Sequence, residues 1–152
     1  MNQYEEICKD MGQRAKMASF ELAQLDQETL DSALLAIADA VEAQTDEIMA
    51  ANELDLEKSV GYNLPRTMID RLTLTPSRIA QMAEGVRQVA VLESPVGSII
   101  ETITRPNGLI IEKRSVPFGV ISIIFEARPN VTIDAGVLCL KTANATILRG
   151  GK

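Results

Sequence analysis

The sequence predicts an α/β protein in which helices come first, a β-hairpin follows, and a β-α-β unit of a nucleotide-binding sheet comes last. Three observations carry this prediction. Apolar residues recur at helical spacing through the first part of the chain, two β-branched segments then flank a Pro-Asn-Gly turn, and an apolar run, a helical segment and a short strand come last. We expect a helical part over residues 1–95, a hairpin over 96–115 and the start of the sheet over 116–152.

Composition narrows the possible functions. The 152 residues carry a net charge of −6, so a general affinity for nucleic acid or for an anionic membrane is not expected. The start resembles no signal peptide, and no run reaches the roughly 18 apolar residues of a spanning helix, so we expect a cytoplasmic protein. Two cysteines and no histidine exclude a disulfide framework, a zinc finger and a Ser-His pair within the chain, and no metal site is expected.

Apolar rows and capping residues predict the helices. The first helix buries the row Ile7, Met11, Ala15, Ala18 and Leu22, and the second buries Leu30, Leu34, Ile37 and Val41. Asp26 is expected to cap the second helix and Thr45 a third. Pro65 begins a short helix, and Thr75-Pro76 pairs an N-cap residue with a proline at the first helical position. The last row comprises Ile79, Met82, Ala83, Val86 and Val89, in which methionine is a core filler.

The hairpin is predicted from segments 98–104 and 109–116, which are rich in β-branched residues and flank Arg105-Pro106-Asn107-Gly108. A lone two-stranded ribbon is only marginally stable in water. It therefore either packs on another sheet, in a further part of the chain or in a second subunit, or forms an edge of the same domain. The pattern favours neither alternative.

The β-α-β unit begins with an apolar run over residues 120–125, which is typical of a strand covered on both faces in a parallel sheet. A helix should start near Asn130, end around residues 142–144, and lead into a strand over 145–148. Its apolar residues are Val131, Ile133, Val137, Leu138 and Leu140.

Ligands of open parallel sheets bind beyond the carboxyl ends of the strands. In this chain those ends are the loop 125–130 and the tail 149–152, which we expect to lie side by side. The loop lacks the G-x-G-x-x-G fingerprint of dinucleotide sites. However, NADP enzymes place a cation beside the 2′-phosphate, and Arg149 and Lys152 stand where such a cation is needed. The alternative is that both are ordinary surface charges.

The loop also holds candidate substrate residues. Asn130 can cap the helix, which its spacing favours, or donate to a developing oxyanion. Arg128 can bind a carboxylate or phosphoryl group through two parallel hydrogen bonds, or pair with Glu126. Cys8 and Cys139 are not expected to be nucleophiles, because neither has a histidine or a well-placed cation to activate it.

The segment 116–152, with its "RPNVT" and "ILRGG" elements, closely resembles the γ-glutamyl phosphate reductases, the glutamate-5-semialdehyde dehydrogenases of the aldehyde dehydrogenase superfamily. The upstream "NELDLE", "RLTLT" and "RPNGLIIEKRSVPFGV" are similar too, so the resemblance covers essentially the whole chain. It implies the N-terminal third of such an enzyme: part of an aldehyde-dehydrogenase-like Rossmann domain, without the catalytic domain.

The resemblance implies a reaction and its residues. NADPH reduces L-glutamyl 5-phosphate to L-glutamate 5-semialdehyde with release of phosphate, in proline biosynthesis, after a cysteine thiolate has attacked the acyl phosphate. Asn130 matches the oxyanion donor, and Arg149 matches the superfamily's cofactor-ribose lysine. The substrate residues are Arg128 and Asn130. The cofactor residues are Phe125, Glu126, Ala127, Arg149, Gly150 and Lys152.

Two departures from the family pattern limit this expectation. The loop is longer than in ordinary aldehyde dehydrogenases, which leaves the register around residues 126–128 open. Neither Cys8 nor Cys139 matches the catalytic cysteine, so the chain alone is not expected to turn over. The alternatives are a non-catalytic NADP-binding or oligomerisation module and another aldehyde dehydrogenase, although "EARPNVT" replaces the "PWNFP"-like loop of the latter. The expected partners are a second copy through the hairpin and, in the pathway, glutamate 5-kinase.

Overall fold

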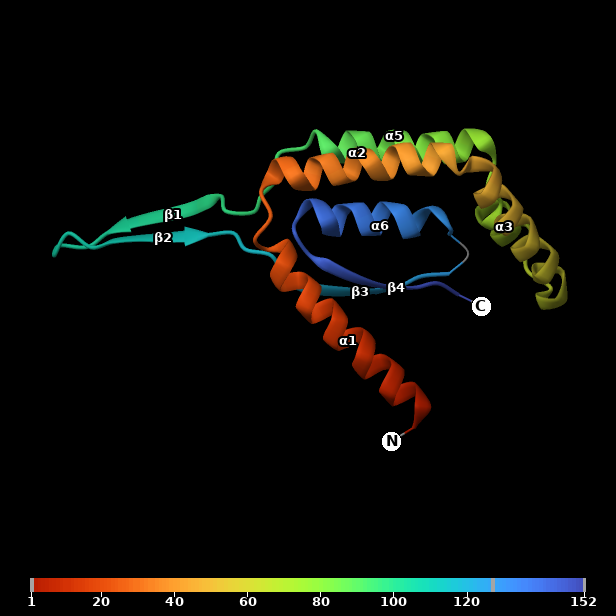
Figure 1. Cartoon of the computed structure of the whole chain (residues 1–152), viewed down its shortest axis with the longest axis horizontal. Coiled ribbons are helices and arrows are strands. Elements are labelled where there is room, and N and C mark those ends of the chain that lie inside the picture. The colour runs from red at the N-terminus through yellow and green to blue at the C-terminus, as the bar shows by residue number, and fades with distance from the viewer. Residues whose placement is uncertain (1, 127, 152) are drawn as a thin grey trace.

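The computed structural model describes residues 2–126 and 128–151. Helices α2 and α5 lie side by side over α6, α6 covers one face of a small β3–β4 sheet, and α1 crosses the other face (Figure 1). The elements are α1 (Gln3–Leu22), α2 (Gln27–Ala43), α3 (Thr45–Ser59), a 3-10 turn (Val60–Tyr62), α4 (Arg66–Leu72), α5 (Pro76–Ala90), β1 (Ile99–Thr104), β2 (Ile110–Arg114), β3 (Val120–Ile124), α6 (Asn130–Lys141) and β4 (Ala145–Arg149). The predicted α/β order is confirmed, and no described helix is long and apolar enough to cross a membrane.

Two of the three caps predicted for the helices before the hairpin are confirmed. The Asp26 carboxylate accepts a hydrogen bond from the Thr29 N–H at 2.8 Å, and hydrogen bonds from Thr29 lower the pKa of Asp26. Thr75 accepts from the Arg78 N–H at 3.2 Å, with Pro76 at the start of α5. The predicted Thr45 cap is wrong. Only Gln44 separates α2 from α3, so Thr45 is already helical and its hydroxyl donates to the Glu42 carbonyl at 2.8 Å.

The core lies where α2, α5 and α6 meet. Leu34 of α2 and Ile79 of α5 are fully buried, and Val137 of α6 is 4% exposed. The apolar rows predicted for α2 and α5 therefore face this core, and Met82 fills it as expected. Burial of each large aliphatic side chain stabilises the fold by about 1.5–3 kcal/mol.

Charged residues tie the same three helices together. Lys141, at the end of α6, is only 3% exposed, and its ammonium group donates to Asp31 of α2 at 2.6 Å and to the Ala90 carbonyl of α5 at 2.7 Å. On the outer side, the Arg87 guanidinium of α5 binds both carboxylate oxygens of Glu42 at 2.8 and 2.9 Å, which lowers the pKa of Glu42. α2 is thus joined to α5 and α6 by ionic contacts that the apolar pattern does not reveal.

The parallel pair β3–β4 has the register Val120↔Ala145 to Ile124↔Arg149. The start of this strand pair is held by Asn144, which is buried and whose side-chain oxygen accepts a hydrogen bond from the Gly119 N–H at 2.9 Å. The prediction that β3 is covered on both faces is wrong at its carboxyl end, where Ile124 is 72% exposed. The reason is that α1 packs chiefly against β4. Leu138, one of the apolar residues of α6, lies on the side away from the core and is 52% exposed.

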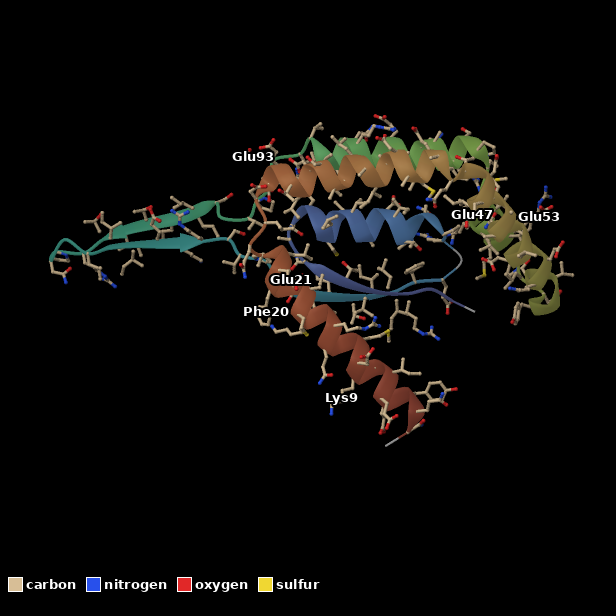
Figure 2. The ribbon with its side chains drawn as sticks, viewed as in Figure 1. Lys9, Phe20, Glu21, Glu47, Glu53 and Glu93 are labelled. Atoms are coloured by element: carbon tan, nitrogen blue, oxygen red, sulfur yellow. The ribbon has the colours of Figure 1, made fainter. Side chains whose placement is uncertain are left out.

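The hairpin projects from the body as its own two-stranded sheet (Figure 1). The predicted turn is confirmed: the Gly108 N–H donates to the Arg105 carbonyl at 2.9 Å, with Gly108 at a φ of 83° that suits glycine. Every residue of β1 and β2 is exposed, and side chains stand on both faces of the ribbon (Figure 2). Among the described residues this sheet does not pair with β3–β4, so the two pairs of strands form separate sheets.

Candidate functional site

The carboxyl ends of β3 and β4 lie side by side, as predicted. The Phe125 N–H donates to the Arg149 carbonyl at 3.0 Å, which extends the strand pairing by one residue. Beyond it the two segments come still closer: a Cβ placed on Gly151 would lie 3.3 Å from Cγ of Glu126 and 3.5 Å from its Cα. Only a residue without a side chain fits there without displacing Glu126, so the two glycines form a narrow backbone edge beside the loop.

Among the residues that the structure describes, Arg149 is the positively charged residue at this edge. It is exposed, and its Nη1 donates to the Gly150 carbonyl at 3.2 Å. No carboxylate of the described residues pairs with it. Two further predicted cofactor residues, Ala127 and Lys152, lie outside the described residues. Arg149 therefore keeps most of its donors free for an anion at the end of β4.

The predicted substrate residues line one pocket of about 410 Å³. Arg128 comes from the β3–α6 loop and Asn130 from the first turn of α6. The opposite wall is formed by α4, the α4–α5 connection and the start of α5, which contribute Arg71 and Arg78. Arg128 forms no ion pair with Glu126 within residues 2–126 and 128–151, so that alternative interpretation is wrong. The pocket is large enough for a small metabolite.

Asn130 is not the cap of α6. Pro129 occupies the N-cap position and Asn130 is the first helical residue, so the interpretation favoured by spacing is wrong. Its amide nitrogen instead donates to the Asp134 carboxylate, one turn further along, at 2.9 Å. Both residues line the pocket. Because an asparagine amide carries two N–H groups, this contact leaves one donor for a bound ligand.

The α4–α5 connection, in the wall facing Asn130, is fixed by two side chains that are not among the predicted site residues. Buried Asn52 of α3 donates to the Leu72 carbonyl at 2.9 Å and accepts the Leu74 N–H at 2.7 Å. Arg78 binds the backbone carbonyls of Asp70 and Thr73 and forms an ion pair with the Asp70 carboxylate at 3.2 Å. The α4–α5 connection is therefore fixed from two sides. The partners of Asn52 are 20 and 22 residues away, so no local motif marks it.

Neither cysteine belongs to this pocket. Cys139 is buried in α6, nine residues beyond Asn130 and therefore about 13 Å along the helix axis. Cys8 is exposed on α1, which lies on the opposite face of the sheet from α6 (Figure 1). The described residues thus provide donors and cations for a substrate but no thiol next to Asn130.

Comparisons with known proteins find relatives over most of the chain. No protein-family model matches the chain. It is 55% identical over 141 residues to the γ-glutamyl phosphate reductase of Bartonella tribocorum, an alignment that spans 93% of this chain and 34% of that protein. The crystal structure of γ-glutamyl phosphate reductase from Thermotoga maritima is similar with a TM-score of 0.88 and 35% identity, over 91% of this chain and 34% of that one.

A more distant neighbour bears on the fold alone. The structure of a probable aldehyde dehydrogenase from Listeria monocytogenes matches 96% of this chain with a TM-score of 0.65 at 16% identity. The chain therefore has the fold of the N-terminal portion of aldehyde-dehydrogenase-like proteins. It spans about a third of the length of the relatives it matches.

Proposed function

We propose that this chain, which is related in sequence to the N-terminal third of the γ-glutamyl phosphate reductases, takes part in the NADPH-dependent reduction of L-glutamyl 5-phosphate to L-glutamate 5-semialdehyde. The observation that supports this most directly is that the carboxyl ends of β3 and β4 lie side by side and that the loop after β3 also lines the pocket of Arg128 and Asn130. The end of β4 offers Arg149, a cation without a carboxylate partner among the described residues, and the loop after β3 leads to Arg128 and Asn130.

The strand ends fit a dinucleotide. Gly150 and Gly151 offer backbone without side chains beside Phe125 and Glu126, so a pyrophosphate-containing ligand can approach closely. Arg149 supplies the charge for a 2′-phosphate, which distinguishes NADP from NAD. We include Ala127 and Lys152 in this cofactor site. When bound, NADPH supplies the hydride for the reduction.

The pocket fits the acyl group. Arg128 can bind the phosphoryl oxygens through its guanidinium, and the free N–H of Asn130 can donate to the oxygen of the carbonyl carbon as it becomes negative. A thiolate from the part of the relatives that this chain does not span attacks that carbon, and the carbon–oxygen bond to phosphate then breaks with release of inorganic phosphate. Asn130 and Arg128 thus stabilise the charge that develops and the group that leaves.

The cofactor assignment predicts a selective loss. We consider a fusion in which residues 1–152 replace the homologous third of the Bartonella tribocorum relative, so that the fusion has the length of that relative. In this fusion, Arg149→Glu should raise the dissociation constant for NADPH on the order of a hundredfold, because a charge-assisted contact becomes a repulsion. NADH, which lacks the 2′-phosphate, should be affected only slightly. Titration of the nicotinamide fluorescence measures both constants.

The matched control is Arg105→Glu, which makes the same charge change in the hairpin turn, away from β4. It should leave both dissociation constants unchanged. If Arg149→Glu weakens NADPH and NADH equally, the assignment of the 2′-phosphate to Arg149 is wrong. If the unsubstituted fusion binds neither cofactor, the cofactor site itself is wrong.

We further propose that the hairpin joins copies of the protein. Ile103 and Ile111 lie opposite each other in the antiparallel register and are about 40% exposed, and Ile100 and Ile110 exceed 60%. An isolated ribbon of two strands is only marginally stable, and an exposed apolar ribbon is a template for pairing with another chain. A second copy would cover it.

This proposal predicts that Ile103→Glu combined with Ile111→Lys lowers the oligomeric state of the fusion. The two charges face each other across the hairpin and can pair, so the ribbon keeps its register while it loses apolar surface. Light scattering during size-exclusion chromatography gives the mass. Exchanging the opposed pair Glu101 and Lys113 is the control and should preserve assembly. An unchanged mass for the isoleucine variant would exclude the hairpin as the contact.

A further inference from the structure

The pocket beside Asn130 holds more positive charge than its own carboxylates neutralise. Its wall carries the guanidinium groups of Arg71, Arg78 and Arg128 and the carboxylates of Asp70 and Asp134. Arg78 is occupied, because it pairs with Asp70 at 3.2 Å and binds two backbone carbonyls. Two cations, Arg71 and Arg128, thus line the pocket without a carboxylate partner among the described residues.

Asp134 does not change this balance. Its carboxylate accepts the Asn130 amide at 2.9 Å and forms no ion pair with either free arginine in the part of the chain that the structure describes. Two unpaired guanidinium groups in one pocket suit a ligand with two anionic groups, because each can bind a carboxylate or a phosphoryl group through two parallel hydrogen bonds.

Arg71 stands on a rigid support. It lies in the last turn of α4, immediately before the connection that Asn52 and Arg78 hold. A side chain on a fixed backbone loses less conformational freedom when it binds a ligand than one on a mobile loop. The fixed connection therefore gives Arg71 a defined place relative to Asn130 on the facing wall.

We infer that Arg71 is a specificity-determining residue that binds the α-carboxylate of the substrate; this inference rests on the proposed function. The substrate carries a phosphoryl group at one end of a five-carbon chain and a carboxylate at the other. Asn130 marks the reacting end, and Arg128 is only two residues before it, so Arg128 serves the phosphoryl group. Arg71, which comes from α4 instead, is left for the distal carboxylate.

The test compares two substrates in the reverse direction, with phosphate and NADP, in the fusion defined above. The first is 1-pyrroline-5-carboxylate, the ring form of glutamate 5-semialdehyde, and the second is 1-pyrroline, which lacks only the carboxylate. Arg71→Gln should raise KM for the first roughly tenfold to a hundredfold, with little change in kcat, because a hydrogen-bonded ion pair is lost. KM for 1-pyrroline should not change. Arg66→Gln, on the same helix but outside the pocket, is the control.

The outcomes separate this inference from the function on which it rests. Equal effects of Arg71→Gln on both substrates would overturn the carboxylate assignment while leaving the reductase function intact. An inactive unsubstituted fusion would count against the proposed function. In that case, the role of Arg71 is tested by NMR titration of the 152-residue chain with two ligands. These are L-glutamate and 4-aminobutyrate, which lacks the α-carboxylate. The Nε–H signal of Arg71 should respond selectively to glutamate, and an equal response, or none, to both ligands would overturn the inference.

Discussion

Replacing Lys141 by alanine is expected to lower the free energy of unfolding by about 3 kcal/mol. The substitution removes the 2.6 Å ion pair with Asp31 and leaves the Ala90 carbonyl without its donor at a site where little water can replace it. The side chain of Asp31 is about one-third exposed, so water partly solvates its carboxylate once Lys141 is removed. The loss of stability therefore lies at the lower end of the range for breaking a buried ion pair. Because folded domains are stable by only about 5–15 kcal/mol, this is a large effect.

Urea unfolding of the chain, followed by far-ultraviolet circular dichroism, measures this change. Lys141→Met keeps the aliphatic stem and removes the charge, so it should recover part of the loss that comes from packing. Lys9→Ala removes an ammonium group that points away from α1 into solvent (Figure 2) and should change stability by less than about 0.5 kcal/mol. If Lys141→Ala is as harmless as Lys9→Ala, Lys141 does not join the three helices in solution.

The sequence predicts the structure correctly where the determining contacts are local. The Asp26 and Thr75 caps each bind an N–H three residues away, and the hairpin turn closes between Arg105 and Gly108. Such contacts are encoded by residue types at short spacings. The side-by-side strand ends also followed from a general property of parallel sheets, because the first strand, the helix and the second strand are consecutive.

Contacts that a polar side chain makes across the fold cannot be predicted from local residue patterns. Lys141 contacts Asp31 from 110 residues away, and the apolar pattern around it could not say that a lysine is buried. Asn52 likewise fixes the α4–α5 connection from another helix. Periodicity predicts which face of a helix is buried but not which element it meets. The wall that carries Arg71 was missed for this reason, whereas Arg128 and Asn130 were found because they follow a predicted strand.

Asn130→Ala is expected to lower kcat of the fusion on the order of 10²–10³-fold, with a much smaller change in KM. The proposed role of this amide is to donate to an oxygen that becomes negative only as the thiolate adds, so its loss affects the transition state more than substrate binding. Phosphate-dependent reduction of NADP with 1-pyrroline-5-carboxylate gives both constants. Thr132→Ala, at an exposed position of the same helix, should leave both unchanged.

Asp134 makes this prediction sharper, because it binds one of the two N–H groups of Asn130 at 2.9 Å and thereby sets the direction of the other. Asp134→Leu should lower kcat, although less than Asn130→Ala, because the amide is still present but no longer oriented. Asp134→Asn keeps an acceptor oxygen at the same place and should restore most of the activity. An Asn130→Ala variant that loses substrate affinity but keeps kcat would instead assign Asn130 to ground-state binding, since only an interaction that strengthens in the transition state lowers the barrier to the chemical step.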